Sequence, residues 1–332
     1  MKKQAKGEAL FMDEKIQALQ AEIEGAVVTK TNPAYEKLRK SFIFEGSPLV
    51  VVLVKTHEDI AKALRFAYDN GLVLSVRSGG HGFGGLSTND GGLVIDLSHF
   101  NEVTIDEDLT LVRVGAGARW GDVAKTLDPY GLAISSGDTT TVGVGGLTLG
   151  GGVGWQARNM GLTVDNLEGA EIVTAAGEVL RASKTEHPDL FWALRGGGGN
   201  FGIVTSFTFR AHDLKKVLKG RVIYPVSALK SVLAKWVTAT AEAPEELNTT
   251  FVVLPGFGPK PTPQLMVLFC CGADDEAKAR TAVQPLLELG KAAQSEVKLV
   301  PYCDSLEEVV PPPGIKTFAQ TGFVKKMDDT FY

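Results

Sequence analysis

The residues best placed to do chemistry lie in one loop, Arg77-Ser-Gly-Gly-His-Gly-Phe-Gly-Gly85. Five of its nine residues are glycine, so the backbone can adopt positive φ and turn successive N–H groups toward an anion. His81 stands in the middle, and Gly80 and Gly82 leave its imidazole open to a large planar ligand. An apolar run at 72–76 predicts a buried strand that ends where the loop begins. The alternative is a tight turn whose histidine bonds to its own loop.

Two further glycine-rich segments follow, at 137–154 and 195–202. The matches to G-x-G-x-x-G at 80–85 and 197–202 raise the possibility of a Rossmann domain, but that fingerprint must open a helix. The first match runs into polar residues and the second into an expected strand, so both fail. A P-loop is excluded because no Gly-Lys-Ser/Thr follows any loop. Three glycine loops at strand ends are consistent with a binding site in which backbone amides line a long dinucleotide. A glycine-rich structural core is the alternative.

A β-α-β unit is expected to carry the first loop. The β-branched run 48–54 predicts a fully buried strand. Thr56-His-Glu-Asp59 matches a capping box and opens an amphipathic helix that ends near Asn70-Gly71. The strand at 72–76 follows. The loop then lies at the carboxyl end of this strand, where ligands often bind in α/β arrangements.

Periodicity and turn signals predict the remaining elements of residues 1–212. They are a helix at 13–24 capped by Asp13, strands at 93–97, 103–105, 111–114, 170–174, 179–182 and 203–209, and helices at 120–127 and 187–194.

Glycine becomes rarer after about Asp213, and this change predicts a second domain at 213–332. Its expected elements are strands at 221–224, 250–254, 264–271 and about 317–324, with helices at 226–241 and 274–289. The sequence therefore predicts an α+β protein of two domains, as its length also favours.

Composition limits the classes of function. The 332 residues are 44% hydrophobic and 22% charged, with 38 glycines, as in a globular protein able to bury a large core. A net charge of −5 argues against a nucleic-acid partner. The N-terminus lacks the apolar segment of a signal peptide, and no apolar run is long enough for a membrane span. We therefore expect a cytoplasmic protein.

Cysteine and histidine usage agrees with that expectation. The three cysteines form no C-x-x-C pair and are expected to be reduced thiols, with Cys270 and Cys271 at the end of an apolar strand. The five histidines are scattered, so no metal site is predicted.

Three segments together carry a resemblance to a known family: the histidine loop, Thr141–Gly154 and Asp189–Thr205. Residues 45–212 resemble the berberine bridge enzyme-like FAD-linked oxidases, which have the vanillyl-alcohol oxidase (PCMH-type) FAD-binding fold. Within that family, bacterial 6-hydroxynicotine oxidase-like members are the most similar. The resemblance implies a PCMH-type domain of two α/β subdomains and a substrate domain with an antiparallel sheet.

By this resemblance His81 matches the histidine that bonds covalently to the 8α-methyl of FAD. Many members carry a second link through cysteine, and Thr139 stands in its place here, so the resemblance implies one covalent link. Val142 matches the small residue that gives oxygen access to the flavin. The full set of implied FAD-binding residues is Arg77, Ser78, Gly79, Gly80, His81, Gly82, Phe83, Ser87, Thr139, Thr141, Val142, Gly145, Gly146, Gly150, Gly152, Val153, Gly202, Ile203 and Val204.

The resemblance implies an oxidase that transfers hydride from a small organic substrate to FAD and returns the electrons to O2 as H2O2. In the family, the catalytic base and a C-terminal segment that returns to the FAD domain come later in the chain, so we expect a truncated second domain and an unassigned base. The alternatives are a dehydrogenase with another electron acceptor and a non-catalytic flavin-binding protein. Substrate identity and oligomeric state are not predicted.

Overall fold

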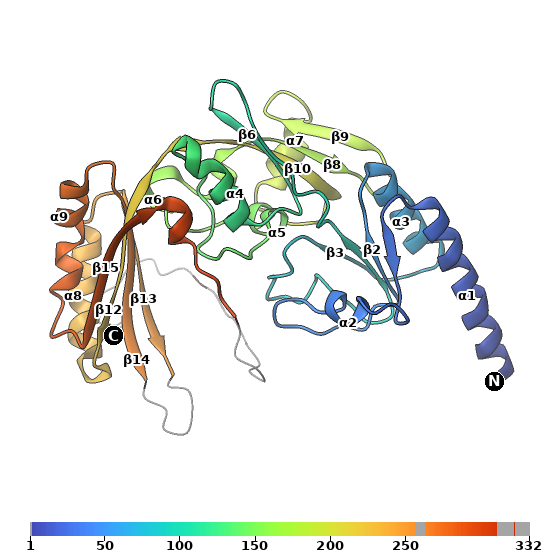
Figure 1. Ribbon diagram of the computed structural model, residues 1–332, viewed down its shortest axis with the longest axis horizontal. Coiled ribbons are helices and arrows are strands. Elements are labelled where there is room, and N and C mark those ends of the chain that lie inside the picture. The colour runs from blue at the N-terminus through green and yellow to red at the C-terminus, as the bar shows by residue number, and fades with distance from the viewer. Residues whose placement is uncertain (1, 256–262, 311–321, 323–332) are drawn as a thin grey trace.

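The protein is built around two sheets in its N-terminal part and one in its C-terminal part (Figure 1). A computed structural model describes residues 2–255, 263–310 and 322. The α+β class expected from the sequence is confirmed. None of the helices in these described ranges combines the length and the apolar character that a membrane span needs.

The first sheet positions the histidine loop. Its strands β2, β4 and β3 run parallel, and β1 is antiparallel at the edge. The order is β1 (Ala26–Val28), β2 (Val50–Leu53), β4 (Leu93–Asp96) and β3 (Leu74–Arg77). The predicted buried strand is confirmed, since Val50, Val51 and Val52 have no exposed surface. The β-α-β unit forms, with β4 inserted between its two strands.

The expectation that a buried strand precedes the loop is wrong. Strand β3 is the edge strand of its sheet, and Val73 is 65% exposed, with Leu74 and Val76 also exposed. The side chains that face inward are Ser75 and Arg77. An apolar run cannot by itself distinguish a central strand from an edge strand, because the exposure depends on which strands pair.

Two helices cover the first sheet. Helix α3 (His57–Asp69) has the predicted cap, with the Thr56 side chain accepting a hydrogen bond from the Asp59 amide. Helix α1 (Lys2–Glu22) begins well before the predicted start, so Asp13 is not its cap. The expected apolar stripe is correct, because Ile16, Leu19 and Ile23 are buried.

The second sheet is wholly antiparallel and has five strands. Its order is β5 (Val103–Ile105), β6 (Leu111–Gly115), β10 (Ile203–Arg210), β8 (Leu167–Val173) and β9 (Val179–Ser183). The predicted hairpin of β5 and β6 is confirmed. The helices of this region are α2 (Tyr35–Leu38), α4 (Trp120–Leu127), α5 (Val144–Leu149), α6 (Ala157–Met160) and α7 (Pro188–Leu194), and a short ladder joins β7 (Leu132–Ala133) to β11 (His212–Asp213).

The third sheet is antiparallel, and helices α8 and α9 pack on one of its faces (Figure 1). Its elements are β13 (Leu247–Leu254), β14 (Gln264–Gly272), β12 (Lys216–Tyr224), β15 (Gln294–Pro301), α8 (Leu229–Ala241) and α9 (Glu276–Leu287). Strand β15 was not predicted, because polar residues alternate along it without a strong apolar face. The strand predicted at 317–324 lies outside the described residues, apart from Gly322.

A buried carboxylate joins α1, β2 and α3. Asp59 is almost fully buried and accepts hydrogen bonds from the amides of Glu24, Gly25 and Lys55 at 2.8, 3.0 and 2.9 Å. Burial alone would raise the pKa of Asp59, but these amides hold that pKa below its ordinary value. The charged carboxylate of Asp59 is therefore the form that these hydrogen bonds stabilise in the folded protein.

We expect Asp59→Asn to lower the free energy of unfolding at pH 7 by about 2 kcal/mol, since an amide replaces an acceptor of charge-assisted bonds. A carboxylate whose folded-state pKa is depressed stabilises the fold fully above the ordinary Asp pKa of about 3.9. This stabilisation is lost as the pH falls from that value through the folded-state pKa. Urea unfolding at pH 7 and pH 3 should show the difference shrinking at pH 3. The exposed Asp69→Asn is the control, and an equal cost at both pH values would contradict the assignment.

Candidate flavin site

The histidine loop leaves the carboxyl end of β3 and holds His81 half-buried. A hydrogen bond joins the imidazole Nε2 to Thr141 Oγ1 at 3.0 Å. The ring of Phe42 stacks on the imidazole, with the centroids 4.1 Å apart and the planes inclined by 21°. Two contacts from distant parts of the chain therefore hold the side chain of His81.

The environment of His81 favours the neutral imidazole. Burial lowers the pKa of His81, and the positive charge of Arg119 nearby lowers it further. The pKa thus lies below the ordinary histidine value, and the ring keeps a free lone pair at neutral pH. A neutral imidazole is able to act as a nucleophile.

The first and second glycine loops meet backbone to backbone. A Cβ added to Gly79 would lie 2.2 Å from the amide nitrogen of Gly143, and one added to Gly143 would lie 2.1 Å from that of Gly79. Ser78 Oγ adds a bridge, donating to the Ala116 carbonyl at 2.6 Å and accepting from the Gly145 amide at 3.3 Å. Only glycine permits this approach, which brings Thr141 onto His81.

The second glycine segment contains the short helix α5, which the sequence did not predict. Gly143 precedes it, and Val144 is fully buried. The low helix propensity of glycine hides such a helix from sequence. Tertiary contacts hold it instead, since the Val144 amide donates to the Ala118 carbonyl at 2.9 Å and the Gly145 amide to that of Ala116 at 3.0 Å.

A strap from the C-terminal part supports the same segment. The Thr140 amide donates to the Glu307 carbonyl at 2.9 Å, and the Glu307 amide donates to the Asp138 carbonyl at 2.8 Å. The Glu307 carboxylate pairs with Lys219 of β12 at 2.6 Å. The third sheet is thereby tied to the loop that carries Thr139 and Thr141.

The third glycine loop ends at Gly202, whose φ is +140°. A Cβ there would lie 2.5 Å from the Val173 carbonyl oxygen. Ile203 and Val204 follow directly as buried residues of β10. The loop therefore opens a strand and not a helix, as the argument against a Rossmann domain requires.

The side chain of Arg77, which is also the last residue of β3, is buried beneath the histidine loop. Its Nε donates to Asp96 Oδ2 at 2.7 Å, and its Nη1 donates to the Lys40 carbonyl at 3.1 Å. Both side chains of the ion pair are buried. The side chain thus anchors the loop to β4, and its Cδ lies 3.4 Å from where a Cβ on Gly80 would be.

The remaining expected positions fit a flat ligand with phosphates. Cβ atoms added to Gly82 and Gly146 would meet nothing within 4 Å, and Ser87 Oγ is buried without a partner among the described residues. Phe83 and Val153 are exposed. Gly150 and Gly152 follow α5, and a Cβ on Gly152 would collide with Thr163. Open glycine surfaces, an unpaired buried hydroxyl and a neutral histidine are suited to FAD.

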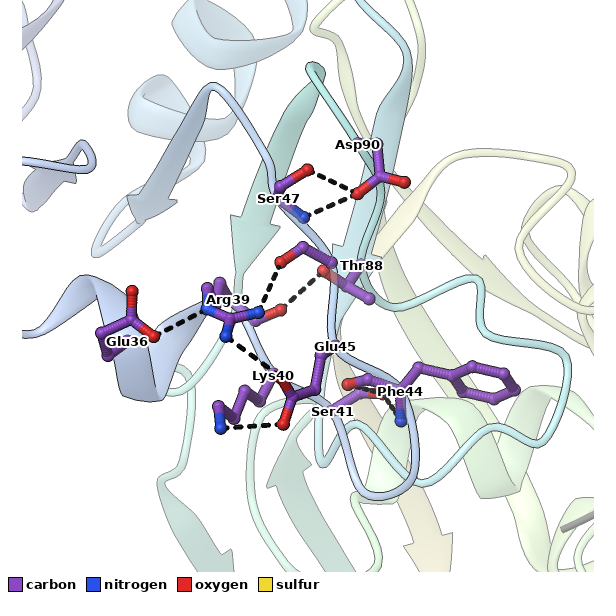
Figure 2. A network of polar contacts seen from close by, with 10 residues as sticks. Glu36, Arg39, Lys40, Ser41, Phe44, Glu45, Ser47, Thr88 and Asp90 are labelled. Carbon is purple, nitrogen blue, oxygen red and sulfur yellow. Dashed lines mark hydrogen bonds and ion pairs between the residues drawn. The ribbon is translucent and has the colours of Figure 1, made fainter. Parts of the chain in front are cut away.

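Sequence reasoning missed the segment that holds Phe42. Figure 2 shows its supports, in which Arg39 contacts Glu36 and Glu45 through ion pairs at 2.9 and 3.0 Å. Arg39 also donates to the Gly46 carbonyl, and its own carbonyl accepts from Thr88 Oγ1. No motif marks Phe42, because its contact with His81 spans distant parts of the sequence.

Comparisons with known proteins identify the family of the chain. Residues 48–183 match the FAD binding domain family. An FAD-linked oxidoreductase of Dictyostelium discoideum is 32% identical over 312 residues, covering 92% of this chain and 67% of the relative. The fold and these matches define the class, and the chain belongs to the FAD-linked oxidoreductases with a PCMH-type FAD-binding domain.

Solved structures also resemble the chain. The 6-hydroxy-D-nicotine oxidase from Arthrobacter nicotinovorans superposes with a TM-score of 0.80 at 33% identity, covering 86% of this chain and 63% of that one. Glucooligosaccharide oxidase from Acremonium strictum, described with a 6-S-cysteinyl, 8α-N1-histidyl FAD, gives 0.74 at 27% identity, covering 88% and 62%. The chain thus spans about two thirds of the length of these relatives.

We expect Gly79→Ala to lower the free energy of unfolding by about 3 kcal/mol, because the new methyl group must displace the backbone at Gly143. The matched control is Gly82→Ala, whose methyl group would meet nothing within 4 Å. Its stability should be unchanged or higher by up to about 1 kcal/mol. Urea unfolding of both variants decides the point, and equal stabilities would contradict the close contact of the two loops.

Proposed function

We propose that the protein is an FAD-dependent oxidase that takes hydride from a small organic substrate and returns the electrons to O2 as H2O2. The observation that carries the proposal is the position of His81, which Thr141 holds between two glycine loops that meet at Gly79 and Gly143. Burial and the charge of Arg119 lower the pKa of His81 and favour its neutral form. The flavin would supply the redox chemistry, while the chain binds and orients the reactants. The predicted residues that would hold FAD are those of the three glycine loops.

We propose a single covalent link, from His81 Nδ1 to the 8α carbon of FAD. Nε2 is engaged by Thr141, and no hydrogen bond to Nδ1 is found among the described residues. Glucooligosaccharide oxidase supports the histidyl link by analogy, and its second link is to cysteine. Here Thr139 is buried and donates through Oγ1 to Asp138 at 2.9 Å, and a hydroxyl is a poor substitute for a thiolate.

The substrate would lie between the flavin and the open face of the third sheet. Helices α8 and α9 cover the opposite face. The open face carries Lys219, Arg221 and Glu296, which form ion pairs across and beyond the strands. Free cysteines, two of them buried, favour a reducing compartment, so we propose a cytoplasmic location.

The experiment compares the wild-type protein with His81→Asn, both loaded with FAD and then precipitated with acid. The wild-type pellet should be yellow, and that of His81→Asn colourless. An oxygen electrode and a substrate screen then separate the classes: oxygen uptake supports an oxidase, and reduction that only a quinone reverses supports a dehydrogenase. Wild-type protein that takes up no FAD would contradict the proposal.

Covalent attachment should accelerate as the pH rises. Below the pKa of His81 the imidazolium has no lone pair, and the lowered pKa places the midpoint below the ordinary histidine value of about 6.5. The measurement is the rate at which acid-precipitable flavin forms from apo-protein and FAD between pH 5 and 8. Arg119→Gln removes a cation and should move the midpoint upward, and a wild-type midpoint above 7 would contradict the account.

A further inference from the structure

We propose that Phe42 is a positioning residue for covalent flavin attachment, holding the imidazole of His81 in the plane from which it reacts. The inference rests on the proposed function and adds a residue that no motif identifies. The rings of Phe42 and His81 are stacked, with their centroids 4.1 Å apart and their planes inclined by 21°.

Two contacts restrain the imidazole in complementary ways. Stacking on Phe42 restricts the tilt of the ring plane, and the hydrogen bond to Thr141 decides which nitrogen points to the second glycine loop. In the tautomer in which Nε2 donates to Thr141, the lone pair lies on Nδ1 in the ring plane. The neighbours of His81 in the chain are Gly80 and Gly82, which have no side chains to pack on the ring.

Phe42 can serve this purpose because its own backbone is fixed to the histidine loop. The Phe42 amide donates to the Gly80 carbonyl at 2.9 Å, one residue from His81. The turn closes through the Ser41 amide, which donates to the Phe44 carbonyl at 2.8 Å. Arg77 then donates to the Lys40 carbonyl at 3.1 Å from below. Movement of Phe42 and of the loop is thereby coupled.

Charged groups hold the base of the same turn (Figure 2). Glu45 accepts from Arg39 at 3.0 Å and from Lys40 at 2.8 Å, so both ends of the turn are joined. Ser47 donates to Asp90 through both its amide and its hydroxyl, at 2.8 and 2.7 Å. The turn is therefore a supported platform for an aromatic ring, although its tip is a loop.

The step that Phe42 would assist balances as follows. Nδ1 of His81 forms a C–N bond to the 8α carbon, while one C–H bond of the methyl group and the imidazole N–H break. The two electrons and two protons pass to the flavin ring system and then to dioxygen, which leaves as hydrogen peroxide. Bond formation needs the lone pair aligned with the carbon, and a misplacement of about 1 Å costs roughly 10²-fold in rate.

The test follows acid-stable flavin over time in apo-protein mixed with FAD, together with total bound flavin. Phe42→Leu should take up FAD but attach it roughly tenfold or more slowly, and Phe42→Tyr should restore the rate. Tyr68→Leu, at an exposed aromatic residue of α3 outside the histidine loop and the Phe42 turn, should react like the wild type. Attachment by Phe42→Leu at the wild-type rate would overturn the inference.

A second readout does not depend on flavin, and its signal comes from the wild-type protein. In the wild-type apo-protein, the imidazole carbon-bound protons of His81, assigned with His81→Asn, should resonate upfield because the Phe42 ring lies over them. Unshifted resonances would overturn the stacking. Wild-type protein that binds FAD without attaching it would overturn the covalent link and this inference together, whereas normal attachment by Phe42→Leu overturns the inference alone.

Discussion

The close contact of Gly79 with Gly143 is the constraint on which the candidate site depends. The first glycine loop follows β3 of the first sheet. The second glycine loop packs beside the end of β6 in the second sheet. The two backbones are so close that a single methyl group at either position would collide. Thr141 reaches His81 because of this contact. The site is therefore a product of the junction between two sheets and would not exist in either alone.

The ion pair of Arg77 and Asp96 fixes the loop from within the protein. Burying two charges costs several kcal/mol per ion before they attract each other, so such a pair adds little net stability. Its value here is geometric, because Arg77 also binds the Lys40 carbonyl next to the turn that carries Phe42. One guanidinium group thus links β4, the histidine loop and the Phe42 turn. An apolar pair would pack as well but would not set their relative positions.

Much of the framework could be predicted from sequence because it depends on local signals. The valines of β2, the cap at Thr56 and the hairpin of β5 and β6 each have their cause within a few residues. The family resemblance likewise rests on contiguous motifs, and the matches found with known proteins confirm it. The assignment of individual flavin-binding residues stays a prediction.

The remaining features depend on contacts between distant residues. Helix α5 forms in a glycine-rich segment because carbonyls of Ala116 and Ala118 hold it. The exposure of Val73 follows from the position of β3 at the sheet edge, and the role of Arg77 from its pairing with Asp96. Phe42 carries no motif at all. In each case the cause lies elsewhere in the chain, where propensity and periodicity carry no information.

We propose that FAD is attached to His81 and to no other residue of the chain. Peptide mapping of the FAD-loaded protein after trypsin tests it most directly, because His81 lies in the fragment Ser78–Arg113 and Thr139 in the fragment Thr126–Arg158. We expect one FAD on the first fragment, at His81, and an unmodified second fragment. Flavin on the second fragment, or no attached flavin on either, would contradict it.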